Sequence, residues 1–174
     1  MIAVDTSVFL YLIKPDSSPP VDTATGKPVE GCQNRIEFLI SSLSKAGTKL
    51  VLPTPVVTEM LVSTGESAAG VLEILRRQSV FRVADFDQRA ALECSAMMSQ
   101  HWAGRLKQLK TEVGRHRIKF DLMIVAIARA AGAQEILSDD KSVKNVAAIA
   151  GMPCRGIADL PLPPGPDQPS FRDI

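Results

Sequence analysis

The chain lacks the features that mark secreted, membrane and thiolate-metal proteins. Its three cysteines, Cys32, Cys94 and Cys154, are widely spaced and include no CxxC pair, so neither a disulfide framework nor a thiolate zinc site is indicated. No apolar run reaches the roughly 20 residues that a membrane span needs. Residues 1–5 lack the basic start of a secretory signal. We therefore expect a cytoplasmic protein with no membrane association.

The overall composition is that of an ordinary globular domain. The 174 residues include 45% hydrophobic and 22% charged residues, with a formal net charge of +1, and these values argue against a disordered or fibrous chain. A chain of this length supports one domain with a sizeable core. The positive charges are unevenly distributed, because the segment from His101 to Lys119 is strongly basic. Its cations are Arg105, Lys107, Lys110, Arg115, Arg117 and Lys119.

Short apolar runs alternate with helical patterns along most of the chain. We expect strands at residues 2–4, 49–52, 80–83, 135–138 and 152–156. We expect helices at residues 33–46, 54–61, 67–78, from 87 towards 101, 120–131 and 143–150, with Asp121 at the entrance of the helix at 120–131. Residues 8–13 fit either a helix or further strand. The alternation predicts an α/β fold.

Two segments do not follow this alternation. Residues 14–31 are rich in proline, glycine and polar turn residues, and we interpret them as a long loop that covers a site, contacts a partner or is mobile. Residues 159–174 contain too much proline for a helix or a central strand. We interpret them as an extended or disordered tail and assign the domain to residues 1–158.

Several acids stand where a parallel sheet would bring them together. Asp5 follows the first predicted strand, Asp140 follows a late strand, and Asp121 is at a helix start. The carboxyl ends of parallel strands meet at one edge, and ligands bind in the crevice there. Carboxylate oxygens suit Mg²⁺ or Mn²⁺, which points to phosphate chemistry. Each Asp alone is more often a turn or helix-cap residue, so the prediction depends on the whole set.

Four short motifs, taken in order, resemble those of the PIN-domain ribonucleases, and in particular the VapC-like toxins of toxin–antitoxin pairs. The resemblance extends from Ile2 to about Gly156. The four motifs are Val4 to Phe9 with Asp5, Thr58-Glu59, Phe120 to Ala128 with Asp121, and Leu137 to Lys141. In the last motif Asp140 matches the family's acid and Asp139 its variable position, with a one-residue ambiguity in register. The long loop at residues 14–31 and the tail depart from the family pattern.

The resemblance implies a PIN-like three-layer α/β sandwich, with a mainly parallel central sheet flanked by helices. It implies an endoribonuclease that hydrolyses RNA phosphodiester bonds with Mg²⁺ or Mn²⁺, a toxin neutralised by an antitoxin, and a homodimer. The implied catalytic residues are Asp5, Glu59, Asp121 and Asp140. Of these, Asp5, Asp121 and Asp140 hold the metal, directly or through water, and Glu59 positions water or acts as a base. Thr6 and Ser138 can hold the carboxylates or a bound water in place.

The basic segment allows two interpretations. Arg105, Lys107, Lys110, Arg115, Arg117 and Lys119 can guide an RNA backbone towards the acids, because they directly precede Asp121. They can equally form the solvated face of a helix and a loop.

Two other classes of function are open. A PIN-like domain can serve as an RNA- or protein-binding scaffold with little or no catalysis, and metal titration would separate this case from an active nuclease. A phosphatase or a response-regulator-like protein would also carry an Asp at a strand end. That class is disfavoured, because the DxDxT pattern is absent after the first strand and the acids are spread over four elements.

Overall fold

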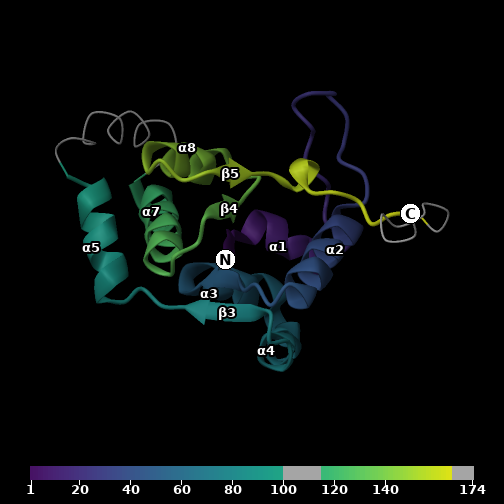
Figure 1. The fold of residues 1–174 in the computed structure, drawn as a ribbon, viewed down its shortest axis with the longest axis horizontal. Helices are drawn as coiled ribbons and strands as arrows, with labels where there is room; N and C mark the ends of the chain where they lie inside the picture. Colours follow the sequence, from purple (N-terminus) through teal and green to yellow (C-terminus); the bar gives the residue numbers. More distant parts are fainter. Residues whose placement is uncertain (100–114, 166–174) are drawn as a thin grey trace.

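Strands and helices alternate along the chain in the computed structural model, which describes residues 1–99 and 115–165, with only the backbone for 115–117 (Figure 1). The order is β1 (Ile2–Val4), α1 (Thr6–Ile13), α2 (Cys32–Lys45), β2 (Leu50–Pro53), α3 (Thr54–Thr64), the 3₁₀ helix η1 (Gly65–Ser67), α4 (Ala68–Arg77), β3 (Phe81–Ala84), α5 (Gln88–Met97), α7 (Arg115–Ala130), β4 (Glu135–Leu137), α8 (Lys141–Ile149), β5 (Cys154–Arg155) and the 3₁₀ helix η2 (Ile157–Asp159). The strands agree with those expected from the sequence to within two residues at each end.

The described strands form one sheet in the order β3-β2-β1-β4-β5, and every pairing in it is parallel. The central strand β1 pairs with β2 through Ile2 and Leu50, and with β4 through Val4 and Leu137. The chain therefore builds the sheet outward in both directions from β1. Ligands of such sheets bind beyond the carboxyl ends of the strands where the order reverses. In this fold that place is the end of β1 and β4.

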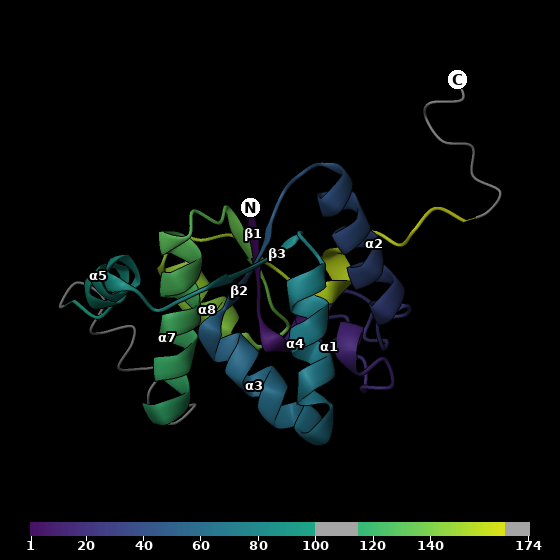
Figure 2. The ribbon, with the colours of Figure 1, turned by 90° about the horizontal axis from the view of Figure 1, so that it is seen from below.

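Helices cover both faces of the sheet, which confirms the three-layer α/β sandwich. Helices α7 and α8 lie on one side of the strands, with α5 outside α7, and α1, α2 and α4 lie on the other side (Figure 2). Helix α3 starts at the carboxyl end of β2 and contacts both α1 and α7. Within the described part of the chain, no helix has the length and apolar character that crossing a bilayer demands.

Apolar side chains fill the space between these layers. All four residues of β2 are buried, as are Ala3 and Val4 of β1, and unbroken apolar runs of this kind are expected for strands covered on both faces. Phe9 of α1 meets Phe81 of β3 edge to face, with ring centroids 5.5 Å apart. Ile124 of α7 is also almost wholly buried. The strands that carry the candidate site are thus held rigidly in the core.

The start of α7 differs from the sequence expectation. Apolar periodicity predicted a helix from Phe120 with Asp121 at its entrance, but the helix begins at Arg115 and Asp121 lies in its second turn. The prediction was wrong because residues 115–119 contain a single apolar residue, Ile118, so the repeat was not visible there. Residues 8–13, which fitted either a helix or a strand by sequence, belong to helix α1.

Residues 14–31 form a loop, as predicted, with a hairpin-like turn that projects from the domain (Figure 1). Val21 and Pro28 form an isolated antiparallel bridge. The Asp22 carboxylate accepts two hydrogen bonds within the turn. Val29 is buried at the base of the loop. The loop therefore has a defined conformation and a fixed attachment to the domain.

The chain after β5 packs against α2. Arg35 of α2 donates hydrogen bonds to the carbonyl groups of Ala158 and Leu160, and Leu160 is only 1% exposed. The first residues of the predicted tail, 159–174, therefore pack on the domain. The proposed boundary after residue 158 stays a prediction.

Candidate active site

Asp5 lies directly after β1, where its side chain caps the N-terminus of α1. It is 4% exposed. Its Oδ2 atom accepts hydrogen bonds from the hydroxyl groups of Ser7 at 2.7 Å and Ser138 at 2.8 Å. Among the described residues, the groups that donate to this carboxylate all reach Oδ2. Its second oxygen, Oδ1, is therefore available to a cation.

Asp140 lies after β4 and caps the N-terminus of α8. Its Oδ1 atom accepts a hydrogen bond from the Ser142 N–H at 2.7 Å, and its own N–H donates to the Ser138 hydroxyl at 3.0 Å. Ser138 therefore contacts both Asp140 and Asp5. The structure brings these two predicted residues together at the ends of adjacent strands.

Asp139 precedes Asp140 but its side chain is directed elsewhere. It accepts a hydrogen bond from the Ile157 N–H at 3.1 Å and lies 4.0 Å from the Lys144 ammonium. A Cβ atom at Gly156 would lie 2.4 Å from its Oδ1. Burial raises the pKa of Asp139, while the Ile157 N–H and Lys144 act in the opposite direction. Asp139 thus secures the segment after β5.

Asp121 reaches the same edge of the sheet from α7. It is 5% exposed and accepts a hydrogen bond from the hydroxyl of Ser142, which is itself 3% exposed. Since the Ser142 N–H binds Asp140, this one residue contacts two of the predicted metal ligands. The sequence analysis missed Ser142. Its position two residues after a helix-capping Asp was the available signal, because a cap binds the N–H of the second or third helical residue.

The three predicted metal ligands are thus linked through a series of hydrogen-bonded residues, with Asp140 taking part through its backbone N–H on one side and through its carboxylate on the other. The series runs from Asp5 through Ser138, Asp140 and Ser142 to Asp121. It joins the ends of β1 and β4 to α7, and it lies where the strand order of the sheet reverses. Donors of this kind fix the orientation of carboxylates that serve a metal.

Glu59 is held beside this series rather than within it. It lies on the exposed side of α3, and its Oε2 atom accepts a hydrogen bond from the Thr6 hydroxyl. Thr6 is the first residue of α1 and directly follows Asp5. Thr6 was predicted to hold a carboxylate in place, and the carboxylate that it contacts is that of Glu59.

The donor set suits a hydrated divalent ion. Among the described residues, no three His, Cys, Asp or Glu side chains lie close enough to hold a metal ion as a group. Mg²⁺, however, is usually bound by one or two carboxylates, with water completing its shell. Asp5 and Asp121 are both almost wholly buried, and a bound cation would offset part of the cost of desolvating their carboxylates. A cation in contact with one or two of the acids, and with the rest through water, fits this arrangement.

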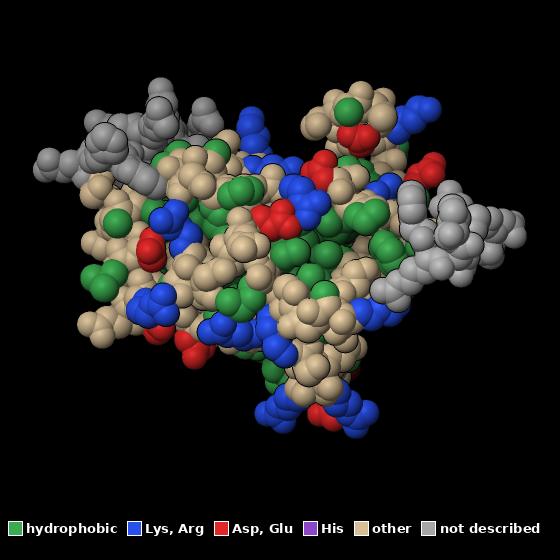
Figure 3. Space-filling view, in the orientation of Figure 1, with side chains coloured by type: hydrophobic (Ala, Val, Ile, Leu, Met, Phe, Trp, Pro, Cys, Tyr) green, Lys and Arg blue, Asp and Glu red, His purple; other side chains and the backbone are tan. Residues whose placement is uncertain are grey.

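Of the predicted RNA-binding cations, only Lys119 has a described side chain. Arg105, Lys107 and Lys110 lie outside the described residues, and the side chains of Arg115 and Arg117 do too. Lys119 is exposed on α7, two residues before Asp121, and Lys141 is exposed next to Asp140 at the start of α8. On the face shown in Figure 3, the described side chains mix basic and acidic groups and form no continuous patch of either sign.

The three cysteines are free thiols. Cys32 and Cys94 are buried and Cys154 is half-buried. Burial raises the pKa of all three, that of Cys154 to about 11. Burial thus favours the protonated form of these thiols near neutral pH.

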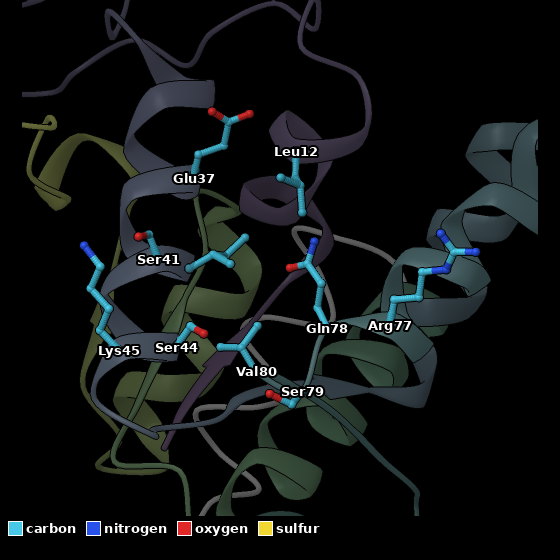
Figure 4. A pocket seen from close by; sticks show the side chains of 10 residues that line it. Leu12, Glu37, Ser41, Ser44, Lys45, Arg77, Gln78, Ser79 and Val80 are labelled. Atoms are coloured by element: carbon cyan, nitrogen blue, oxygen red, sulfur yellow. The ribbon is translucent and has the colours of Figure 1, made fainter.

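A groove of about 640 Å³ lies apart from the acids, between α2 and the segment that joins α4 to β3 (Figure 4). Leu12, Ile40 and Val80 are among its apolar lining residues, and Glu37 and Lys45 contribute charge from α2. Because residues 78–80 precede β3, the groove is near the amino ends of the strands. None of the predicted catalytic acids lines it.

The fold and the site together define a class. A parallel α/β sandwich that gathers acids beyond the ends of two central strands is a doubly wound domain whose acids lie at the switch point of the sheet. The family model of the PIN domain matches residues 30–149, which is more than half of the chain. The chain belongs to the PIN domain family. A comparison with curated proteins gave no significant match.

Solved structures agree with this assignment at the level of the fold. VapBC2 of Rickettsia felis, bound to a DNA fragment from its promoter, is 15% identical, with 90% of this chain and 98% of that chain covered and a TM-score of 0.56. FitAcB of Neisseria gonorrhoeae is 18% identical, with coverages of 92% and 100% and a TM-score of 0.55. VapBC-1 of nontypeable Haemophilus influenzae is also 18% identical, with coverages of 91% and 100% and a TM-score of 0.57. The PIN-like fold expected from the sequence is thus confirmed.

Proposed function

We propose that the protein is a metal-dependent endoribonuclease that hydrolyses RNA phosphodiester bonds. The observation that carries this proposal is the hydrogen-bonded series that joins Asp5, Asp140 and Asp121 at the switch point of the sheet. Membership of the PIN domain family, whose members are generally nucleases, supports the proposal. Carboxylates gathered at such an edge suit phosphate chemistry with a divalent ion.

The acidic residues of the site have two different roles in the proposed hydrolysis. Asp5, Asp121 and Asp140 hold Mg²⁺ or Mn²⁺, directly or through water. The ion supplies neutralisation of phosphate charge and activation of water. Glu59, which is exposed and anchored by Thr6, orients the attacking water or accepts its proton. The water oxygen bonds to phosphorus, the bond to the leaving oxygen breaks, and that oxygen takes up a proton.

Cleavage of a random-sequence single-stranded RNA pool by the purified protein tests the proposal. We expect cleavage with Mn²⁺ or Mg²⁺, none after chelation, and a loss of roughly a hundredfold or more in Asp5→Asn. Asp16→Asn, on the exposed surface of the 14–31 loop, is the matched control and should cleave like the wild type. A wild-type protein that cleaves no RNA with either ion would contradict the proposal.

The RNA backbone is proposed to contact Lys119 together with the other cations of its basic segment, Arg105, Lys107, Lys110, Arg115 and Arg117. Each phosphate that these cations neutralise should add about −0.7 to the slope of log affinity against log salt concentration. Lys119→Ala is therefore expected to reduce that slope by about the contribution of one phosphate.

Metal titration tests the alternative that the domain is a binding scaffold. A protein that binds RNA but binds no metal would favour that alternative.

We also propose that a partner antitoxin holds this activity in check in the cytoplasm. The solved structures that the chain resembles include VapBC complexes, and VapC-like proteins are the toxins of toxin–antitoxin pairs. Expression of the wild type in a bacterial host should arrest growth, whereas Asp5→Asn should not.

The protein is also proposed to form a homodimer. Light scattering of the purified protein tests this, and the mass of a monomer would contradict it.

A further inference from the structure

We propose that Ser142 is a positioning residue that fixes Asp121 and Asp140 relative to each other for a divalent ion, a role that rests on the proposed function. Ser142 lies at the second position of α8 and is 3% exposed. Its backbone N–H donates to Asp140 Oδ1 at 2.7 Å and its hydroxyl donates to Asp121 Oδ2. One buried residue thus contacts two carboxylates that come from different helices.

The effect of the contact between Ser142 and Asp121 depends on the single hydroxyl proton of Ser142. A serine hydroxyl has one proton to donate, and an ionised carboxylate such as Asp121 can only accept. The proton is therefore committed to Asp121 and cannot also satisfy a backbone carbonyl group, as serines in helices often do. Because the site is buried, a hydrogen bond to a charged group is stronger there than in water. The side chain of Asp121 is thereby held in one orientation.

Asp121 reaches the site from a different position than the other two acids. Asp5 and Asp140 cap helices that begin beside them, so backbone N–H groups already orient them. Asp121 instead lies in the second turn of α7, where helical N–H groups are used within the helix. Without an ion, the like charges of Asp121 and Asp140 repel each other. Ser142 donates to both and therefore keeps them in place before an ion binds.

Ser138 has the corresponding role at the other end of the series. Its hydroxyl donates to Asp5 and accepts from the Asp140 N–H, so Asp140 is held between two serines. Loss of the Ser142 hydroxyl would break the series at its last link only. The contacts of Ser138 with Asp5 and with the Asp140 N–H would remain, so the substitution removes the hydroxyl contact with Asp121 and leaves those two in place.

Mn²⁺ binding to the full chain, measured by electron paramagnetic resonance without RNA, tests this role. We expect Ser142→Ala to weaken Mn²⁺ binding by about tenfold to a hundredfold, whereas Ser142→Thr, which keeps a hydroxyl, retains most of the affinity. Ser44→Ala, at an exposed position on α2, is the matched control and should bind like the wild type. Should Ser142→Ala not fold, Ser142→Cys gives the same comparison, because a thiol is a weak donor.

Two further outcomes keep this role separate from the proposed function. If the wild type binds Mn²⁺ and the folded Ser142→Ala variant binds it equally well, the role of Ser142 is overturned and the proposed function stands. A wild type that binds no Mn²⁺ overturns both. In an Asp121→Asn background, Ser142→Ala should cause no further loss of Mn²⁺ affinity, because its hydroxyl acts through Asp121. Independent, additive losses would show that Ser142 acts by another route.

Discussion

Two adjacent acids, Asp139 and Asp140, have different surroundings at the end of β4. Asp140 shares Ser138 with Asp5 and binds Ser142, whereas Asp139 binds the Ile157 N–H. We therefore predict that Asp140→Asn lowers Mn²⁺-dependent RNA cleavage by about a hundredfold or more. Asp139→Asn should keep cleavage close to the wild-type rate. Single-turnover cleavage at saturating Mn²⁺ measures both, and the reverse pattern would mean that Asp139 is the catalytic acid.

Asp139 should make stability depend on pH. Burial raises its pKa in the folded protein above the ordinary value, so the folded state binds a proton more readily than the unfolded state. The free energy of unfolding should therefore fall as pH rises from the ordinary value of 3.8 through the raised value. Asp139→Asn removes this titration, so its urea-unfolding stability should fall less over that window. An unchanged difference between variant and wild type across the window would contradict this account.

The site residues that could be predicted from the sequence are those that belong to a family-like motif or follow a predicted strand. Asp5 and Asp140 each follow a strand, so their convergence follows from parallel topology. Ser142 has no such signal, because serines are common near helix starts. Its proposed role depends on a contact with Asp121, which lies 21 positions earlier in the chain. The side-chain directions of Asp139 and Asp140 likewise depend on tertiary contacts that no local pattern reveals.

At the scale of the elements, the segment between β5 and η2 must approach β4 closely. A Cβ atom at Gly156 would lie 2.4 Å from Asp139 Oδ1 and 3.3 Å from Lys144 Nζ. We predict that Gly156→Ala lowers the free energy of unfolding by about 1–3 kcal/mol, since the neighbouring side chains must move. Urea unfolding followed by circular dichroism measures the change.

Gly70→Ala in α4 is the matched control for this steric effect. No atom lies within 4 Å of a Cβ built there, so the substitution should raise stability by about 0.5–1 kcal/mol through helix propensity. A loss of stability in Gly70→Ala as large as that in Gly156→Ala would show that the clash with Asp139 is not the cause.

Elements with a clear apolar repeat were predictable, and those without one were not. Helix α2 agrees with its expected range to within one residue at each end, because Ile36, Ile40 and Leu43 recur at helical spacing and are buried. The start of α7 was missed, because its basic first turn carries only Ile118 as an apolar residue. The choice between helix and strand for α1 was open because the run after Ser7 is apolar throughout.

At the scale of the whole molecule, the candidate site joins parts of the chain that are far apart in sequence. Asp5 and Asp140 lie at opposite ends of the domain sequence but next to each other in space, because β1 and β4 are paired. This arrangement predicts that an ion at the site stabilises the entire fold. At a Mn²⁺ concentration 100 times its dissociation constant, binding contributes about 2.7 kcal/mol.

The melting temperature should therefore rise by roughly 5–10 °C at that Mn²⁺ concentration. Asp121→Asn should show little of this rise, because it removes one of the charges that the ion compensates. Differential scanning fluorimetry with and without Mn²⁺ measures the shift, and NaCl at equal ionic strength controls for screening of surface charge. An equal rise in the wild type and in Asp121→Asn would place the stabilising ion elsewhere.

The central claim is that Asp5, Asp121 and Asp140 form one divalent-metal site at the switch point of the sheet. Crystals soaked in Mn²⁺, examined by anomalous diffraction at the manganese edge, test it most directly. We expect an anomalous peak among these three carboxylates, in direct contact with one or two of them. A Mn²⁺-saturated crystal whose only anomalous peaks lie away from these residues would contradict it.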